Sequence, residues 1–103
     1  MSKRTMQLLA DCAPVFNMLQ DKNRQQIILL LFDKHELSVT ELTDQLSLSR
    51  PAVSHHLKLL LDTGLVSFRK DGKERIYHLD LEPSYQLLKE FLASLEHDLK
   101  MMS

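Results

Sequence analysis

The side chains best suited to chemistry in this chain are hydrogen-bond donors spaced at helical intervals between Ser49 and Leu65. On a helical wheel they fall mostly on one face, and they are Arg50, Ser54, His55 and Lys58. Cationic, hydroxyl and imidazole groups on one short helix can reach both the phosphates and the base edges of DNA. The pattern therefore predicts a helix that reads a major groove.

This segment also carries its own start and stop signals. The Ser49 hydroxyl can cap the first turn, and Pro51 stands where a missing N–H costs little. Gly64 follows the last turn and can adopt a left-handed backbone. The face opposite the polar one is apolar at helical spacing, through Val53, Leu57, Leu60 and Leu61.

Two β-prone runs, 65–70 and 74–79, follow the helix and flank Asp71-Gly72. Asp-Gly between such runs predicts a tight hairpin, because glycine accepts the positive φ of the turn. The hairpin tip is basic, with Arg69, Lys70, Lys73 and Arg75. A recognition helix, here called the reading helix, followed by a basic hairpin is the pattern of a winged helix-turn-helix. The hairpin is the wing, and it contacts the DNA backbone.

Positive charge is concentrated in this part of the chain. The whole sequence has a net charge of −1, whereas residues 50–75 hold six Lys and Arg against three Asp and Glu. An ordinary solvated surface is the alternative interpretation of these cations. Their coincidence with the predicted helix and hairpin favours a DNA-facing surface.

The remaining segments predict a mainly helical fold with one small β-hairpin. Apolar spacing predicts helices over 5–20, with a bend or restart near Ala13-Pro14, and over 23–32. Ser38 and Glu41 form a capping box that opens a short helix to Leu46. A long helix is expected to start at Pro83 or Ser84 and end near Met101.

The last helix carries a heptad-like apolar stripe, formed by Tyr85, Leu88, Leu92, Leu95, Leu99 and Met102. It can pack on the chain's own core or on a second copy. We favour a homodimer, because two extra amphipathic helices would leave apolar surface exposed on a monomer. The expected interface comprises Leu8, Cys12, Val15, Leu88, Leu92, Leu95 and Leu99. Residues 1–103 are expected to form one winged helix-turn-helix domain with terminal dimerisation helices.

Composition excludes several classes of protein. No apolar run is long enough for a membrane span, no signal peptide is recognisable, and the single cysteine fits a reducing cytoplasm. No Gly-rich phosphate loop, nucleophile elbow or acid–base group suggests an enzyme, and no cofactor is expected. A winged-helix module that binds proteins and not DNA remains the alternative function.

The chain resembles the ArsR/SmtB family of dimeric winged-helix repressors over roughly residues 15–80. The resemblance is carried by 15–24, by 36–42, by the whole of 49–65, and by wing positions that include Arg69, Gly72, Tyr77 and Leu79. It implies a sequence-specific transcriptional regulator, a repressor released from double-stranded operator DNA by an effector whose identity the sequence does not specify. The expected DNA-binding residues are Ser49, Arg50, Pro51, Ser54, His55, Lys58, Arg69, Lys70, Lys73 and Arg75.

The departures from the family pattern concern metal binding. Metal-sensing members commonly carry Cys-Val-Cys where this chain has Ser38 and Thr40, and neutral hydroxyls are poor ligands for soft metals. A second family site, across the dimer, would correspond here to Asp80, Glu82, Glu96 and His97. Its first histidine is missing, so a solvated surface is the preferred interpretation and no metal is expected.

Histidines and the cysteine have simpler interpretations. His55 and His56 point about 100° apart on a helix, so they cannot chelate one ion together. We expect His55 to face DNA and His56 to be partly buried. His35 and His78 lack a ligand partner at useful spacing. Cys12 is expected to be a small buried hydrophobe, with a thiol switch across the dimer axis as the alternative.

Overall fold

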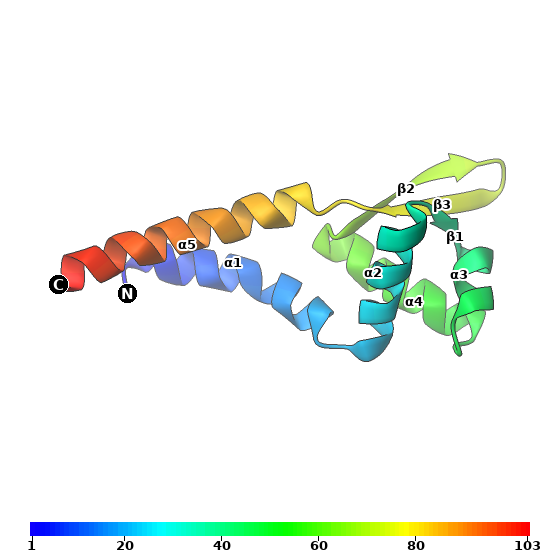
Figure 1. Cartoon of the computed structure of the whole chain (residues 1–103), viewed down its shortest axis with the longest axis horizontal. Helices are drawn as coiled ribbons and strands as arrows, with labels where there is room; N and C mark the ends of the chain where they lie inside the picture. Colours follow the sequence, from blue (N-terminus) through cyan, green and yellow to red (C-terminus); the bar gives the residue numbers. More distant parts are fainter.

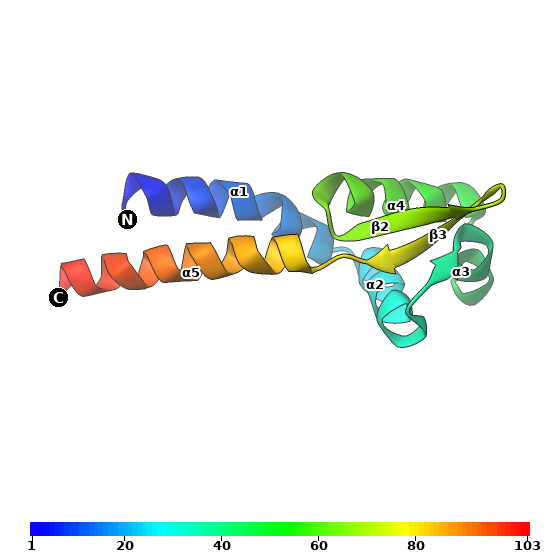
Figure 2. The same ribbon diagram turned by 90° about the horizontal axis from the view of Figure 1, so that it is seen from above.

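The computed structural model describes all residues 1–103 and is elongated, with extents of 55 × 24 × 21 Å. Two terminal helices, α1 (Lys3–Leu19) and α5 (Glu82–Met102), lie side by side and form an arm (Figure 1). The other elements form a body at one end of this arm, and both chain termini lie at the opposite end (Figure 2). The body contains α2 (Lys22–Lys34), β1 (Leu37–Ser38), α3 (Val39–Gln45), α4 (Arg50–Thr63), β2 (Val66–Asp71) and β3 (Glu74–Leu79).

Local capping signals place the helices of the body. The Asp21 carboxylate accepts hydrogen bonds from the backbone N–H groups of Asn23 and Arg24 at the start of α2. These bonds hold the pKa of Asp21 below its ordinary value. The predicted capping box is confirmed, because the Ser38 hydroxyl accepts from the Glu41 N–H and the Glu41 carboxylate accepts from the Ser38 N–H.

One apolar core holds α2, α3, α4 and the sheet together and also includes Val15 from α1. Its members are fully or almost fully buried, and they are Val15, Ile27, Leu31, Leu37, Leu42, Val53, Leu57, Leu60, Leu65, Val66 and Tyr77. Ile28 and Leu30 are only partly buried, while Leu29 and Phe32 on the same helix are exposed. Of the apolar residues in the predicted helix 23–32, Ile27 and Leu31 therefore lie fully in the core.

The sheet has three antiparallel strands in the order β1-β3-β2. The predicted hairpin is present, with Val66 opposite Leu79 and Asp71 opposite Glu74, and Gly72 at its tip has a φ of 63°. The sequence did not predict the third strand, in which Leu37 pairs with Tyr77. This pairing ties the entrance of α3 to the wing.

In the arm, α1 and α5 each bury one stripe against the other. On α1 the buried side chains are Thr5, Leu8, Cys12 and Val15. Leu8, Cys12 and Val15, which we expected at the interface between two chains, are thus covered within a single chain, and Cys12 has no exposed surface. Burial also raises the pKa of the Cys12 thiol, as expected of a buried hydrophobe, and this conflicts with a thiol switch across a dimer axis.

The free end of the arm is closed by a small polar cluster around the buried Asp98. The Asp98 carboxylate accepts hydrogen bonds from the Ser2 backbone N–H at 2.9 Å and from the Ser2 hydroxyl at 3.1 Å. The Thr5 hydroxyl contacts that of Ser94 on α5. The pKa of Asp98 lies below its ordinary value, because Thr5 and Ser2 stabilise the ionised form by hydrogen bonding.

Two further expectations concern helix continuity and membranes. The helix α1 runs without interruption through Pro14, so the predicted restart there is wrong. Among the helices, none combines the length and the apolar character that a membrane crossing requires.

Candidate nucleic-acid interface

The helix α4 presents one buried and one exposed face, as its sequence predicts. The Ser49 hydroxyl accepts from the Ala52 N–H at its start, and Gly64 closes it in the left-handed region at a φ of 83°. The buried face contributes Val53, Leu57 and Leu60 to the core. Ser54, His55 and Lys58 are exposed on the opposite face, together with Ser49, Arg50 and Pro51 at the start of the helix. The core thus fixes the helix while its polar face remains free.

Arg50 is held in place by a residue from another helix. Its Nη1 donates a hydrogen bond of 2.7 Å to the hydroxyl Oγ1 of Thr40 on α3. Both residues line a polar cleft of about 210 Å³, which the wing closes on its other side with Lys73, Glu74 and Arg75. The cleft brings together cations that lie 25 residues apart in the sequence.

The four cations of the wing are not equivalent. Arg69 Nη2 donates to Glu36 Oε2 at 2.9 Å, and this hydrogen bond and charge hold the pKa of Glu36 below its ordinary value. The Arg75 guanidinium lies over the ring of Phe68, 4.4 Å from its centroid. Lys70 and Lys73 are exposed at the tip and form no ion pair. The wing therefore carries two free lysines and two arginines that already have intramolecular contacts.

The two adjacent histidines differ in the way expected from their helical positions. His55 is exposed, whereas His56 is half-buried and its Nδ1 lies 3.4 Å from Nη1 of Arg24. Arg24 also donates from Nε to the carbonyl of Met18, so His56 borders the junction between α1 and α2. The ring centroids of His55 and His56 are 6.1 Å apart, and the two ring planes are inclined at 53°.

The residues considered for metal binding have other contacts. Ser38 belongs to the capping box, and Thr40 accepts from Arg50. Asp80 accepts from the Ser67 hydroxyl, Glu82 from Gln86, and Glu96 lies 3.6 Å from the ammonium of Lys100. Along α5, Glu82 and His97 are about 22 Å apart at a rise of 1.5 Å per residue. One chain alone therefore does not assemble these groups, and it holds no other cluster of three such ligands.

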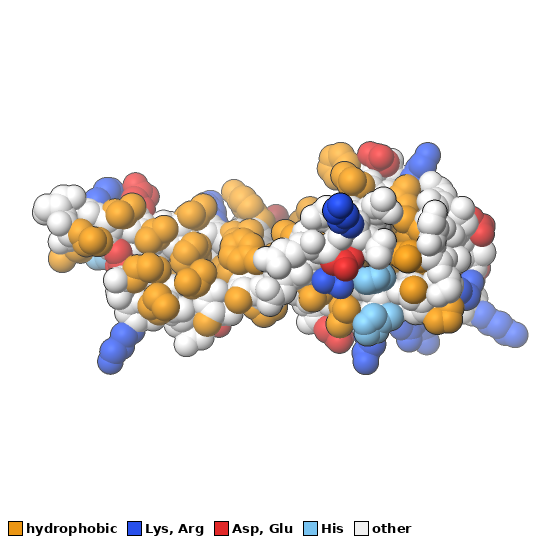
Figure 3. Space-filling view, turned by 90° about the horizontal axis from the view of Figure 1, so that it is seen from below, with side chains coloured by type: hydrophobic (Ala, Val, Ile, Leu, Met, Phe, Trp, Pro, Cys, Tyr) orange, Lys and Arg blue, Asp and Glu red, His pale blue; other side chains and the backbone are white.

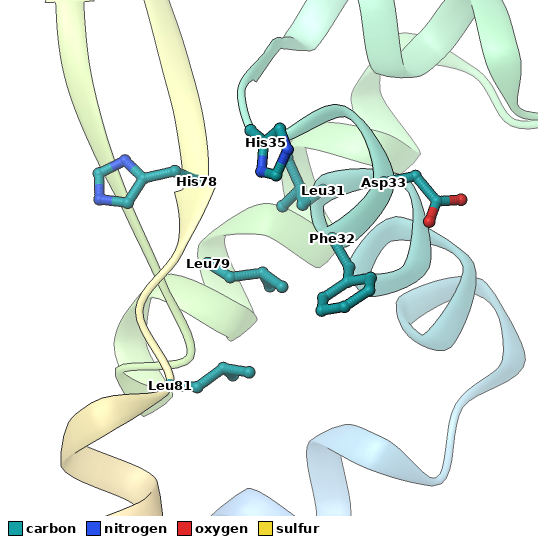
Figure 4. A pocket seen from close by; sticks show the side chains of 7 residues that line it. All are labelled: Leu31, Phe32, Asp33, His35, His78, Leu79 and Leu81. Atoms are coloured by element: carbon teal, nitrogen blue, oxygen red, sulfur yellow. The ribbon is translucent and has the colours of Figure 1, made fainter.

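A cavity of about 560 Å³ lies away from the reading helix, between the end of α2, the strand β3 and the start of α5. Figure 4 shows Phe32, Leu79 and Leu81 extending into this space, while the rings of His35 and His78 do not face each other. His35 is the one non-glycine residue with positive φ, at 70°.

Sequence reasoning missed two residues of this surface, Thr40 and Glu36. Each contacts a predicted arginine from another element, at separations of 10 and 33 residues. No local periodicity or capping signal links residues so far apart. The β1–β3 pairing, which places the entrance of α3 beside the wing, is the tertiary feature that brings them together.

Comparison with known proteins assigns the chain to a family. Residues 21–67 match the family described as bacterial regulatory protein, arsR family. The chain is 39% identical over 87 residues to a cadmium resistance transcriptional regulatory protein, CadC homolog, of Staphylococcus aureus, covering 84% of this chain and 72% of that protein. It is 43% identical over 65 residues to the arsenical resistance operon repressor of Escherichia coli, covering 63% and 56%.

Solved structures agree with these sequence relatives. Reduced HlyU from Vibrio cholerae superposes with a TM-score of 0.72 at 33% identity, covering 91% of this chain and 97% of that one. The relatives are transcriptional regulators and not enzymes, and the shared fold is the winged helix predicted from the sequence. The chain therefore belongs to the ArsR family of bacterial regulatory proteins and is a DNA-binding transcriptional regulator.

Proposed function

We propose that the protein is a homodimeric repressor that binds double-stranded operator DNA in the cytoplasm and is released by an effector. In each chain α4 enters a major groove, where Ser54 and His55 contact base edges. The start of α4 and Lys58 contact the backbone or a guanine, and the wing contacts phosphates beside the groove. The observation that carries this proposal is that one face of α4 is polar and exposed, while the opposite face is apolar and buried in the core.

The proposed residues are favoured by where their charges lie. Arg50, Lys58, Lys70, Lys73 and Arg75 belong to α4 or the wing and are all exposed. Ser49, Pro51, Ser54 and His55, at the start and on the polar face of α4, are exposed as well. Arg69 is retained as a DNA contact of lower importance, because its guanidinium already pairs with Glu36.

The dimer interface that we propose is the outer stripe of α5. Tyr85, Leu92 and Leu99 are 54%, 61% and 57% exposed at heptad spacing, and Leu88 and Leu95 between them are half-buried. Figure 3 shows hydrophobic side chains in a row along the arm. Such a continuous apolar surface favours a partner, and a two-fold dimer supplies the second reading helix for a second half-site.

Soft metals are not the effector in this proposal. Ser38 and Thr40 replace the thiolates of metal-sensing relatives, and both hydroxyls already hold structural hydrogen bonds. We expect micromolar arsenite, cadmium or lead to leave the operator complex intact. Release by arsenite or cadmium would contradict the assignment, and release by zinc alone would point to Asp80, Glu82, Glu96 and His97 across the dimer.

The decisive experiment is selection of duplexes from random DNA by the full chain, followed by measurement of affinity and mass of the complex. We expect a symmetric site with half-sites about 34 Å apart, bound by two chains. Failure to enrich any sequence, together with weak binding independent of salt, would favour the alternative of a protein-interaction module.

A further inference from the structure

Three separate elements converge on the polar cleft beside α4. Thr40 comes from α3, Arg50 from the first turn of α4, and Lys73 and Arg75 from the wing. The cleft has a volume of about 210 Å³, which is enough space for one phosphodiester group.

The charges of the cleft favour an anion. Its wall holds three cationic side chains and a single carboxylate, that of Glu74 at the wing tip. The Glu74 side chain makes no ion pair with them. A singly charged phosphate would meet an excess of positive charge, and the exposed Arg50 and Lys73 could approach it from two sides.

Thr40 has a distinct role in this arrangement. Its hydroxyl accepts one hydrogen bond from the Arg50 guanidinium, at 2.7 Å, and leaves the other donors of that group free. Ser38, the other hydroxyl of the cleft, is already engaged in the capping box. A long arginine that is ordered before binding loses less conformational freedom when it meets its ligand.

We propose that this cleft binds one backbone phosphate of operator DNA and that Thr40 positions Arg50 to contact it. The inference rests on the proposed function and adds Thr40 to the residues that determine affinity. In this arrangement the same phosphate is held by both the wing and the reading helix.

The test compares Thr40→Val, which keeps the shape and removes the hydroxyl, with Thr40→Ser, which keeps the hydroxyl. The probe is the duplex that the native full chain selects from random DNA. Thr40→Val should bind it about tenfold more weakly, because an Arg50 side chain that is not ordered beforehand loses more conformational entropy, which lowers affinity about two- to twelvefold at each of the two clefts of the dimer. Its slope of log affinity against log salt should fall by up to about 0.9 per cleft, while Thr40→Ser stays near native values.

A double substitution shows whether Thr40 acts through Arg50. In an Arg50→Ala background, Thr40→Val should have no further effect, and ethylation of one phosphate per half-site should no longer interfere with binding. Native affinity and slope in Thr40→Val, equal losses in Thr40→Ser and Thr40→Val, or independent losses in the double variant would each overturn the inference. Thermal melting checks that all four variants remain folded. If the native chain selects no duplex, the proposed function fails as well.

Discussion

The unequal wing cations predict a salt dependence that can be worked out from their contacts. Lys70 and Lys73 are exposed without an ion pair, so in the complex each is expected to contact one phosphate. Replacing both with alanine then removes two phosphate contacts per chain and four per dimer. At about 0.9 per contact, the slope of log affinity against log salt should fall by about 3.6.

The effect on affinity is large enough to measure directly. Between about 50 and 200 mM salt, the native protein should lose roughly 150-fold more affinity than the Lys70→Ala, Lys73→Ala variant. Fluorescence anisotropy with a labelled operator duplex at five or six salt concentrations provides the slope. Arg75 is unsuited to this test, because its guanidinium also packs on Phe68 and its loss would perturb the hairpin.

Arg69→Ala is the matched control, since Arg69 lies on the same strand with the same charge but is paired with Glu36. We expect its salt slope to remain close to that of the native protein. An unchanged slope in the double lysine variant would show that the wing tip does not contact DNA. A comparable fall in Arg69→Ala would show that the Glu36 pair opens on binding, and the reasoning from free contacts would then be refuted.

Three further predictions concern the reading helix, the arm and acid stability. His55→Ala should weaken specific binding by about 1–3 kcal/mol and leave binding to random DNA almost unchanged, and equal losses on both duplexes in a gel-shift titration would contradict the base contact. Leu92→Lys should convert the dimer to monomers in sedimentation velocity while leaving the circular dichroism spectrum intact, because Leu92 is 61% exposed in the single chain; a dimer that persists would place the interface elsewhere. The folded-state pKa of Asp98 is lowered, so its stabilising contribution is present above the ordinary carboxyl pKa of about 3.9 and is lost as the pH falls through the lowered value. Asp98→Asn should therefore flatten the loss of stability below about pH 4 in urea titrations, and an unaltered pH profile would exclude this role.

The sequence by itself determined the elements and the character of their faces. Ser49 and Gly64 delimit α4, and Asp71-Gly72 places the hairpin, because caps and tight turns depend on residues within a few positions of one another. The apolar period likewise predicted that Val53 and Leu57 would be buried and His55 exposed. These local rules, with the motif of 49–65, were sufficient for the fold class and for the family.

Only the tertiary structure decided which partner each face meets. Two stripes on α5 have similar periodicity, and the sequence did not reveal that the one containing Ser84 and Asp98 packs on α1. As a result Leu8, Cys12 and Val15 are covered within one chain, and the outer stripe of α5 is left exposed. Periodicity specifies the direction of a side chain relative to its own helix and carries no information about the neighbour.

The same limit applies to the charged groups. The sequence shows six cations between residues 50 and 75, but it does not show which of them are already paired within the protein and which are free to contact DNA. Glu36 neutralises Arg69 and Thr40 orients Arg50, because the pairing of β1 with β3 carries the entrance of α3 to the wing. Contacts between residues distant in sequence are set by chain packing, since no local backbone geometry constrains their separation.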